Sequence, residues 1–320
     1  MSVAADRAAP SIVTLTVNPC VDESASVDRV VADRKLRCGF PRHEPGGGGI
    51  NVARAIRRFG GDALAVYPAG GATGASLERL LAAEGIRQSR LSIGSWTRQN
   101  LNVFEESTGR QFRFVFPGPS LAEPEWEACL ARIETIDPFP RLVVGSGSLA
   151  PGVPLDFYAR LAAIVRNHGS RLLLDASGEG LRAALSAGVF LVKPSLSEFQ
   201  GLTGLCGAEE SHLILECSRL VGEGRCDAIV LSLGGAGALL VTARERERWV
   251  APTVPVRSTV GAGDSMLAGI AWRLDSGASI RDAIRFGVAA AAASVMNPGT
   301  ELCRREDVER ILPQVTSVRV

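Results

Sequence analysis

Residues 171–192 read RLLLDASGEGLRAALSAGVFLV and contain the pattern that decides the fold class. The apolar runs Arg171–Leu174 and Val189–Val192 are short and unbroken, as in parallel strands that are buried on both faces. Between them, Gly180–Ala187 has a helical pattern. This strand–helix–strand order is the unit of an α/β fold, in which right-handed crossovers connect parallel strands.

The same alternation extends outward over most of the chain. Further strands are predicted at Ile12–Thr16, Ala63–Tyr67, Arg141–Val144 and Ala228–Leu231. Further helices are predicted at Ile50–Phe59, Ser76–Ala83, Leu155–His168, Ser211–Glu223, Asp264–Leu274 and Ile280–Met296. The sequence therefore predicts a three-layer α/β/α sandwich around a mostly parallel central sheet.

Two segments break this rhythm and predict a small β-sheet outside the main layers. Asn100–Glu105 and Gln111–Phe116 alternate polar and apolar residues on either side of a short polar turn, which is typical of an antiparallel hairpin. Val27–Cys38 is also strand-like. We expect a single domain over 11–315, with lid segments at about 24–42 and 96–117 and an N-terminal extension over 1–10.

Composition excludes several classes of protein. Lys and Arg total 35 and Asp and Glu total 34, so the net charge of +1 disfavours a bulk nucleic-acid or membrane-surface binder. The seven cysteines are odd in number and form no C-x-x-C pair, which disfavours structural zinc and a disulfide scaffold. No apolar run reaches the ~20 residues of a membrane span, and the first ten residues lack the apolar core of a signal peptide. We expect a cytoplasmic protein.

The richest motif is STVGAGDS at 258–265, which is followed at once by a helical pattern. Its two glycines allow a sharp turn, and the helix N-terminus then offers unpaired N–H groups to a phosphate or oxyanion. Asp264 could take a proton from an attacking hydroxyl, or it could simply cap the helix. Both interpretations are open from the motif alone.

Two other glycine-rich turns are candidate binding loops. PGGGGIN at 45–51 fits close approach of the backbone to a polyol, with Asn51 as a hydrogen-bonding group, although a flexible loop is the alternative. LSLGGAGA at 231–238 could cradle nucleotide phosphates or form a tight turn between strands. Gly145–Ala150 superficially matches a dinucleotide motif, but Pro151 and Pro154 disfavour the helix that this motif requires.

Two lysines also stand out, because 33 of the 35 basic residues are arginine. Lys35 and Lys193 supply the only compact ammonium groups, which indicates either a functional requirement at these positions or chance in an arginine-biased chain. The three histidines have no metal-ligand spacing and are expected on the surface.

Taken in order, these motifs resemble the phosphofructokinase B family of ribokinase-like carbohydrate kinases. The matching blocks are Asn18–Asp22, Lys35–Cys38, Gly46–Arg54, Pro68–Gly74, Trp96–Leu101, Gly147–Val153, Lys193-Pro194, Ser258–Met266 and Asn297–Cys303. The resemblance implies a ribokinase-like sandwich with a β-sheet lid that forms a homodimer interface. It implies ATP with Mg²⁺ as phosphoryl donor and fructose 6-phosphate as acceptor, giving fructose 1,6-bisphosphate.

The resemblance also implies a role for each matching residue. The implied catalytic residues are Asp264 as the general base and Gly261, Ala262 and Gly263 as the anion hole. The implied sugar contacts are Asp22, Gly47, Gly48, Asn51 and Ser148, with Lys35, Arg98 and a partner's Arg37 on the phosphate. The implied nucleotide contacts are Lys193, Ser195, Ser232, Gly234, Gly235 and Gly237. Glu198 is implied for Mg²⁺, and a possible K⁺ site is implied at Ser258, Val260, Ser294, Asn297 and Gly299.

Two positions depart from the family pattern, and other functions remain open. Ser195 stands where an asparagine is usual, and Glu301 stands where a basic residue is expected.

Within the family, 1-phosphofructokinase and tagatose-6-phosphate kinase share the catalytic motif. Outside it, a dinucleotide oxidoreductase and a sugar-phosphate sensor without catalysis are the alternatives, and the intact G-A-G-D motif argues against the sensor.

Overall fold

The computed structural model describes residues 9–320, so most of the expected N-terminal extension, residues 1–8, lies outside the described residues. A ten-stranded sheet in the order β14-β13-β12-β11-β10-β9-β8-β1-β4-β5 forms the centre. Neighbouring strands from β11 to β5 are parallel, and β12 to β14 extend the sheet with antiparallel pairs. The strands are β1 (Ile12–Leu15), β4 (Leu64–Ala69), β5 (Arg87–Ser92), β8 (Leu142–Ser146), β9 (Arg171–Asp175), β10 (Val189–Val192), β11 (Cys226–Ser232), β12 (Ala238–Thr242), β13 (Arg246–Val250) and β14 (Thr316–Arg319).

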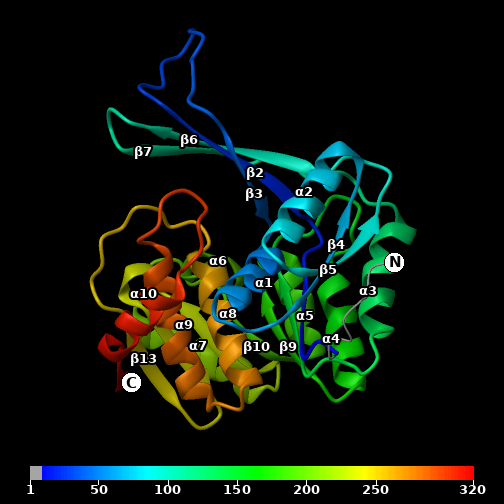
Figure 1. Cartoon of the computed structure of the whole chain (residues 1–320). Helices are drawn as coiled ribbons and strands as arrows, with labels where there is room; N and C mark the ends of the chain where they lie inside the picture. The colour runs from blue at the N-terminus through cyan, green and yellow to red at the C-terminus, as the bar shows by residue number, and fades with distance from the viewer. Residues whose placement is uncertain (1–8) are drawn as a thin grey trace.

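Two layers of helices cover the two faces of this sheet (Figure 1). Alternate residues of one strand serve the two cores: Ile12 belongs to one core and Val13 to the other. The Ile12 core includes side chains of α1 (Gly48–Arg58), α2 (Gly71–Ala83), α8 (Ala262–Asp275), α9 (Ile280–Ser294) and α10 (Arg305–Ile311). The Val13 core includes side chains of α3 (Glu123–Glu134), α4 (Phe157–Asn167), α5 (Gly178–Ala187), α6 (Leu196–Thr203) and α7 (Glu210–Gly222). The predicted three-layer sandwich is confirmed, as are all strands and helices predicted for its layers.

Helices α8 and α9 pack closely against each other. This packing holds the start of α8 in place beside the sheet. A Cβ added to Gly269 would lie 3.1 Å from the backbone of Gly287, so these two glycines let the helix axes approach. Small residues continue in the second half of α9, where Ala289, Ala290, Ala292 and Ala293 are buried. α8 therefore has a fixed position relative to the sheet, and so do the groups at its N-terminus.

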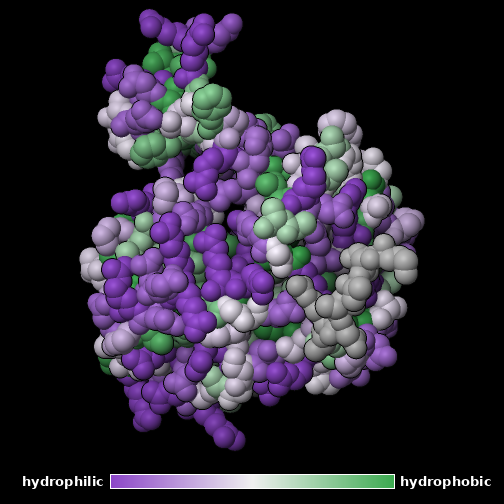
Figure 2. All heavy atoms as spheres, in the orientation of Figure 1, coloured by the Kyte–Doolittle hydropathy of each residue, from purple (hydrophilic) through white to green (hydrophobic). Residues whose placement is uncertain are grey.

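A second sheet of four strands in the order β3-β2-β6-β7 stands apart from the main layers (Figure 1). Its strands are β2 (Cys20–Val27), β3 (Arg42–Gly46), β6 (Arg98–Glu105) and β7 (Arg110–Phe114). We call it the lid sheet. β6 and β7 pair antiparallel, which confirms the predicted hairpin. Figure 2 shows hydrophobic side chains among polar ones on the projecting lid. Five large apolar residues of the lid strands and their flanking segments are exposed: Phe40, Phe104, Phe114, Val115 and Phe116.

The prediction of a strand at Val27–Cys38 is wrong. The strand lies earlier, at β2, and residues 28–41 form a loop that projects from the molecule (Figure 1). β2 is central in its sheet and pairs with both β3 and β6. Residues 28–41 form no such ladder: among the described residues, their one backbone hydrogen bond to a strand is donated by Gly39 N to Ser26 O, at 2.9 Å. Its apolar side chains Val31 and Leu36, which suggested a buried strand, are exposed.

Within residues 9–320, none of the helices combines the length and the apolar character needed to cross a bilayer.

Candidate active site

The candidate site lies at the carboxyl edge of the parallel strands, where ligands of open α/β sheets bind. The chain leaves β8 at Ser146, β9 at Asp175 and β10 just before Lys193, so these polar groups meet at one edge of the sheet. The N-terminus of α8 faces the same edge, because Gly263 lies close enough to Lys193 that an added Cβ would be 3.3 Å from Nζ. Four distant parts of the sequence therefore meet at one point.

The start of α8 has the geometry expected of an anion-binding turn, and we use that name for Gly261–Asp264. Gly261 precedes the helix with φ 73°, a left-handed conformation that favours glycine, and an added Cβ would lie 2.8 Å from Leu302 Cδ2. The first helical hydrogen bond is donated by Ser265 N to Gly261 O, at 2.8 Å. The N–H groups of Ala262, Gly263 and Asp264 thus have no partner within the helix and stand at its positive end.

Asp264 lies in the first turn of α8 but does not cap it. The N-cap is Gly261, and no side chain forms a capping hydrogen bond there. Instead, Asp264 Oδ2 accepts a hydrogen bond of 2.9 Å from Asn51 Nδ2 on α1. Helix capping, the alternative role for this residue, is therefore wrong, and the carboxylate is directed at the junction of the two glycine-rich turns.

The surroundings of Asp264 favour a proton acceptor. Burial and the nearby carboxylates of Asp175 and Asp22 raise the pKa of Asp264 to about 6, and they outweigh the Asn51 hydrogen bond and the Lys193 ammonium, which lower it. A carboxyl group with this pKa is ionised at neutral pH yet basic enough to take a proton. Such tuning is typical of a general base.

Lys193 and Asp175 form a buried ion pair beside this carboxylate. Lys193 Nζ lies 2.9 Å from Asp175 Oδ2, and only 3% of the lysine side chain is exposed. Burial lowers the pKa of Lys193, but the carboxylates of Asp175, Asp264 and Glu198 together outweigh this effect and hold the pKa above its ordinary value. Burial raises the pKa of Asp175, and Lys193 opposes the increase only in part. The cation remains charged next to the anion-binding turn.

The second glycine-rich turn packs tightly against the sheet and is not a flexible loop. Gly47 has φ 117°, and α1 starts directly after it. A Cβ on Gly48 would collide with Ser146 Oγ, and one on Gly49 would lie 2.7 Å from Leu15 O. The lack of side chains brings the start of α1 against β1 and β8, and this positions Asn51 opposite α8.

Asp22 and Ser148 border the same region. The buried Asp22 carboxylate accepts a hydrogen bond of 2.9 Å from Asn100 Nδ2, and a Cβ on Gly46 would lie 2.5 Å from its Oδ2. Ser148 Oγ accepts a hydrogen bond of 3.2 Å from Asn18 Nδ2. The structure thus groups Asp22, Ser148 and the Gly46–Asn51 turn, as a polyol site requires.

The basic residues expected on the phosphate divide into two groups. Arg98 lies at the base of the lid and donates to Phe116 O and Asn18 O, each at 2.9 Å. Lys35 and Arg37 belong to the projecting loop at 28–41, are exposed, and make no hydrogen bond or ion pair with residues 9–320. The structure therefore brings Arg98 close to Asn18 and Ser148 at the candidate polyol site, but it does not bring Lys35 and Arg37 there within a single chain.

A cavity of about 370 Å³ opens beside the anion-binding turn. Ser232, Gly234, Gly235 and Gly237 line one part of it, and Ala262 and Gly263 line another. Its remaining wall is mostly apolar, with α8 and α9 contributing Met266, Val288, Ala291 and Ala292. An apolar chamber that ends at a turn of free N–H groups has the form of a nucleotide site.

Ser195 lies beside this cavity and caps α6. Its neighbour Pro194 accepts a hydrogen bond of 2.9 Å from Ser232 N, so this segment lies alongside the end of β11. Ser195 Oγ accepts from Glu198 N at 3.3 Å, and Glu198 Oε2 accepts from Ser195 N at 2.8 Å. The serine at this unusual position therefore forms a reciprocal capping box with the glutamate expected near Mg²⁺.

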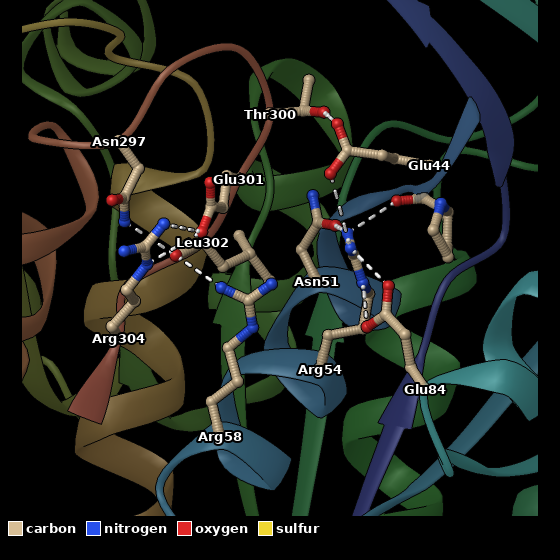
Figure 3. Close-up of polar contacts among 11 residues, drawn as sticks. Glu44, Asn51, Arg54, Arg58, Glu84, Asn297, Thr300, Glu301, Leu302 and Arg304 are labelled. Carbon is tan, nitrogen blue, oxygen red and sulfur yellow. Dashed lines mark hydrogen bonds and ion pairs between the residues drawn. The ribbon is translucent and has the colours of Figure 1, made fainter. Parts of the chain in front are cut away.

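The residues expected around K⁺ come from two segments that meet at the C-terminal end of α9, because Ser258 N donates to Val295 O at 3.2 Å. Ser258 Oγ donates to Gly299 O at 2.6 Å and accepts from Val260 N at 3.2 Å. Asn297 Nδ2 donates to Leu302 O at 3.0 Å (Figure 3). Ser294 Oγ is buried and has no partner among the described residues.

A family model described as pfkB family carbohydrate kinase matches residues 15–307. The chain belongs to this family. The pfkB enzymes most similar to it include ATP-dependent 6-phosphofructokinase isozyme 2 of Mycobacterium tuberculosis, 44% identical over 95% of this chain and 90% of the relative. The enzyme of the same name from Escherichia coli is 42% identical over 94% of this chain and 97% of the relative. The 1-phosphofructokinase of Bacillus subtilis is 28% identical over 97% of this chain and all of the relative.

Solved structures agree with the pfkB assignment. Phosphofructokinase-2 of Escherichia coli in complex with potassium superposes with a TM-score of 0.92 at 41% identity, covering 95% of this chain and 99% of that structure. The same enzyme in complex with fructose-6-phosphate superposes with a TM-score of 0.90 at 39% identity, with the same coverage. The ribokinase-like fold of this pfkB protein is therefore established.

Two polar residues of the pfkB site escaped the sequence analysis. Asp175, the partner of Lys193, ends the strand RLLLD, and a lone acidic residue at the carboxyl end of a parallel strand was the available signal. Asn100, which donates to Asp22, lies in the predicted hairpin and in the matching block Trp96–Leu101, but the sequence gives it no role of its own. Its polar side chain is directed into the buried side of the lid, where an amide has to find partners.

Proposed function

We propose that this protein is an ATP-dependent 6-phosphofructokinase. It transfers the γ-phosphoryl group of ATP to the C1 hydroxyl of fructose 6-phosphate, which yields fructose 1,6-bisphosphate and ADP. The observation that carries this proposal is the 42–44% identity to 6-phosphofructokinases over nearly the whole chain. The site is consistent with it, because a sugar side and a nucleotide side meet at one anion-binding turn.

In the proposed mechanism, Asp264 accepts the proton of the C1 hydroxyl as its oxygen attacks the γ-phosphorus. The new O–P bond forms while the bond from the γ-phosphorus to the β–γ bridging oxygen breaks, and ADP leaves. The free N–H groups of Ala262, Gly263 and Asp264 and the ammonium of Lys193 stabilise the charge on the transferred group. Little covalent chemistry is required of the protein beyond this alignment.

ATP occupies the cavity beside α8 in this proposal, with its phosphates over the Ser232–Gly237 turn. Mg²⁺, when bound, neutralises charge on the ATP phosphates, and Glu198 fits a role near it because Mg²⁺ usually has only one or two protein carboxylates and several waters. The residues expected around K⁺ also fit a cation site, since Ser294 Oγ is a buried oxygen that lacks a partner among the described residues. Ser258, Val260, Asn297 and Gly299 would supply the other oxygen atoms.

The experiment that tests the function is a substrate panel. Steady-state ADP production is measured with fructose 6-phosphate, fructose 1-phosphate and tagatose 6-phosphate at saturating ATP. We expect the highest kcat/KM with fructose 6-phosphate. The second candidate, 1-phosphofructokinase activity, is suggested by the relatives at 28–30% identity, and a preference for fructose 1-phosphate would establish it instead.

The pH dependence of kcat/KM should show an acidic limb near pH 6. Below that pH, Asp264 is protonated and cannot accept the hydroxyl proton, so activity falls as the pH decreases. The phosphate of the substrate also titrates at about pH 6. In Asn51→Ala the carboxylate loses a hydrogen bond that stabilises it, so the limb should move to higher pH. A limb that stays in place would assign it to the substrate.

We also propose a homodimer that forms through the lid, in which the loop at 28–41 serves the partner's site. The exposed aromatic residues of the lid and the distance of the loop from its own site support this arrangement. We expect a chain with Lys35→Met and Arg37→Met and a chain with Asp264→Asn each to be nearly inactive alone. Random 1:1 mixed dimers should recover about a quarter of wild-type activity, because half of the dimers have one intact site. Mixed dimers no more active than the two parents would contradict this arrangement.

A further inference from the structure

Arg54 is a buried cation on α1, one turn after Asn51, and only 1% of its side chain is exposed. Its guanidinium donates to Glu84 through Nε at 2.8 Å and through Nη2 at 2.6 Å. Nη1 donates to Pro45 O at 2.9 Å and to Asn51 Oδ1 at 3.2 Å. Figure 3 shows the arginine between the Glu84 carboxylate and the Asn51 amide.

The two hydrogen bonds to Glu84 fix the plane of the Arg54 guanidinium. A two-point contact between arginine and a carboxylate fixes orientation as well as position. Glu84 follows the last residue of α2, so the anchor belongs to the main domain. Glu44 of β3 lies 3.9 Å from Nη2 and accepts a hydrogen bond from Thr300, so the base of the lid and the loop after α9 meet at the same cation.

This fixed cation decides which way the Asn51 amide points. An asparagine amide has a donor end and an acceptor end of nearly equal size. With Oδ1 on the guanidinium, Nδ2 is directed at Asp264 Oδ2, 2.9 Å away. In the flipped amide, an NH₂ group would face the cation and an oxygen would face the carboxylate, and both contacts would be repulsive.

We propose that Arg54 is a positioning residue for phosphoryl transfer, which acts by holding the Asn51 amide in the orientation that donates to Asp264. It thereby fixes the direction of the carboxylate that faces the sugar hydroxyl. This inference rests on the proposed role of Asp264 as the base. A residue that acts in this way affects kcat, with little effect on the KM for ATP, since the nucleotide lies on the other side of α8.

A double-mutant cycle between Arg54 and Asn51 tests the proposal. Arg54→Met in the wild-type background should lower kcat about 10- to 100-fold and leave the KM for ATP within about twofold. In the Asn51→Ala background, the same substitution should change kcat less than about twofold, because the group through which it acts is gone. Arg57→Met is the matched control, since it removes an exposed arginine from the same helix and should leave kcat unchanged.

Removal of Arg54 leaves the carboxylates of Glu84 and Glu44 without this cation, so thermal unfolding is measured for each variant. If Arg54→Met does not fold, Arg54→Met with Glu84→Gln takes its place in both backgrounds. Wild-type kcat after loss of Arg54, or equal losses with and without Asn51, would overturn the inference alone. A wild-type protein that phosphorylates no sugar phosphate would overturn the proposed function and this inference together.

Discussion

Replacing Asp264 with asparagine should lower kcat by about 10²- to 10⁴-fold, the usual effect of losing a general base. Asparagine has nearly the same shape, and its amide oxygen can still accept the hydrogen bond from Asn51 Nδ2. It cannot accept a proton at neutral pH. The KM for ATP and the unfolding temperature should therefore stay close to the wild-type values.

Stability measurements separate a loss of catalysis in Asp264→Asn from a loss of folding. The residue before α8 that occupies the N-cap is Gly261, so the substitution removes no cap. Circular dichroism and thermal unfolding would show whether the variant is folded. Near-normal turnover in a folded Asp264→Asn protein would mean that another group takes the proton.

Replacing Lys193 with methionine should lower the free energy of unfolding by about 3–5 kcal/mol, as is typical when one partner of a buried ion pair is removed. The substitution leaves Asp175 charged, largely buried and without the ammonium that lies 2.9 Å away. It also removes a positive charge next to the anion-binding turn, so kcat should decrease about 10²- to 10³-fold. Denaturant unfolding and steady-state kinetics measure the two effects separately.

A paired substitution separates these two roles of Lys193. Lys193→Met together with Asp175→Asn removes both charges, and most of the lost stability should return because no unpaired charge remains. Activity should not return, since the ammonium is still absent. A double variant that is as unstable as Lys193→Met would show that the ion pair is not the source of the effect.

The main layers of the fold could be predicted from sequence because parallel strands buried on both faces are continuous apolar runs. The runs at Arg171–Leu174 and Val189–Val192 are of this kind, and both are strands. β2 was missed for the opposite reason. Its sequence, CVDESASV, is polar along the face that borders the site, and the more regular apolar spacing after Val27 belongs to an exposed loop.

The candidate site could be predicted where the backbone conformation requires glycine, because those glycines are visible in the sequence. Gly47 and Gly261 adopt conformations that favour glycine, and both glycine-rich turns were recognised. Asp175 and Asn100 leave no such trace, because their importance depends on which strands become neighbours. The rarity of lysine did single out Lys193, but only the structure pairs it with Asp175.

Lys35 illustrates the limit of reasoning from one chain. Its motif suggested a phosphate contact, yet its loop projects away from the main body of the same molecule (Figure 1). In the proposed dimer, the loop carries Lys35 to the partner's site instead. The mixed-dimer experiment addresses this question directly.

The most direct measurement of the central claim is an internal competition between fructose 6-phosphate and fructose 1-phosphate. Both sugar phosphates are present at equal concentration with a limiting amount of ATP, and the depletion of each is followed by ³¹P NMR. The ratio of the two depletion rates gives the ratio of kcat/KM without any separate calibration. For a 6-phosphofructokinase we expect fructose 6-phosphate to be consumed first, with fructose 1,6-bisphosphate as product. Preferential loss of fructose 1-phosphate, or consumption of neither, would contradict the proposed function.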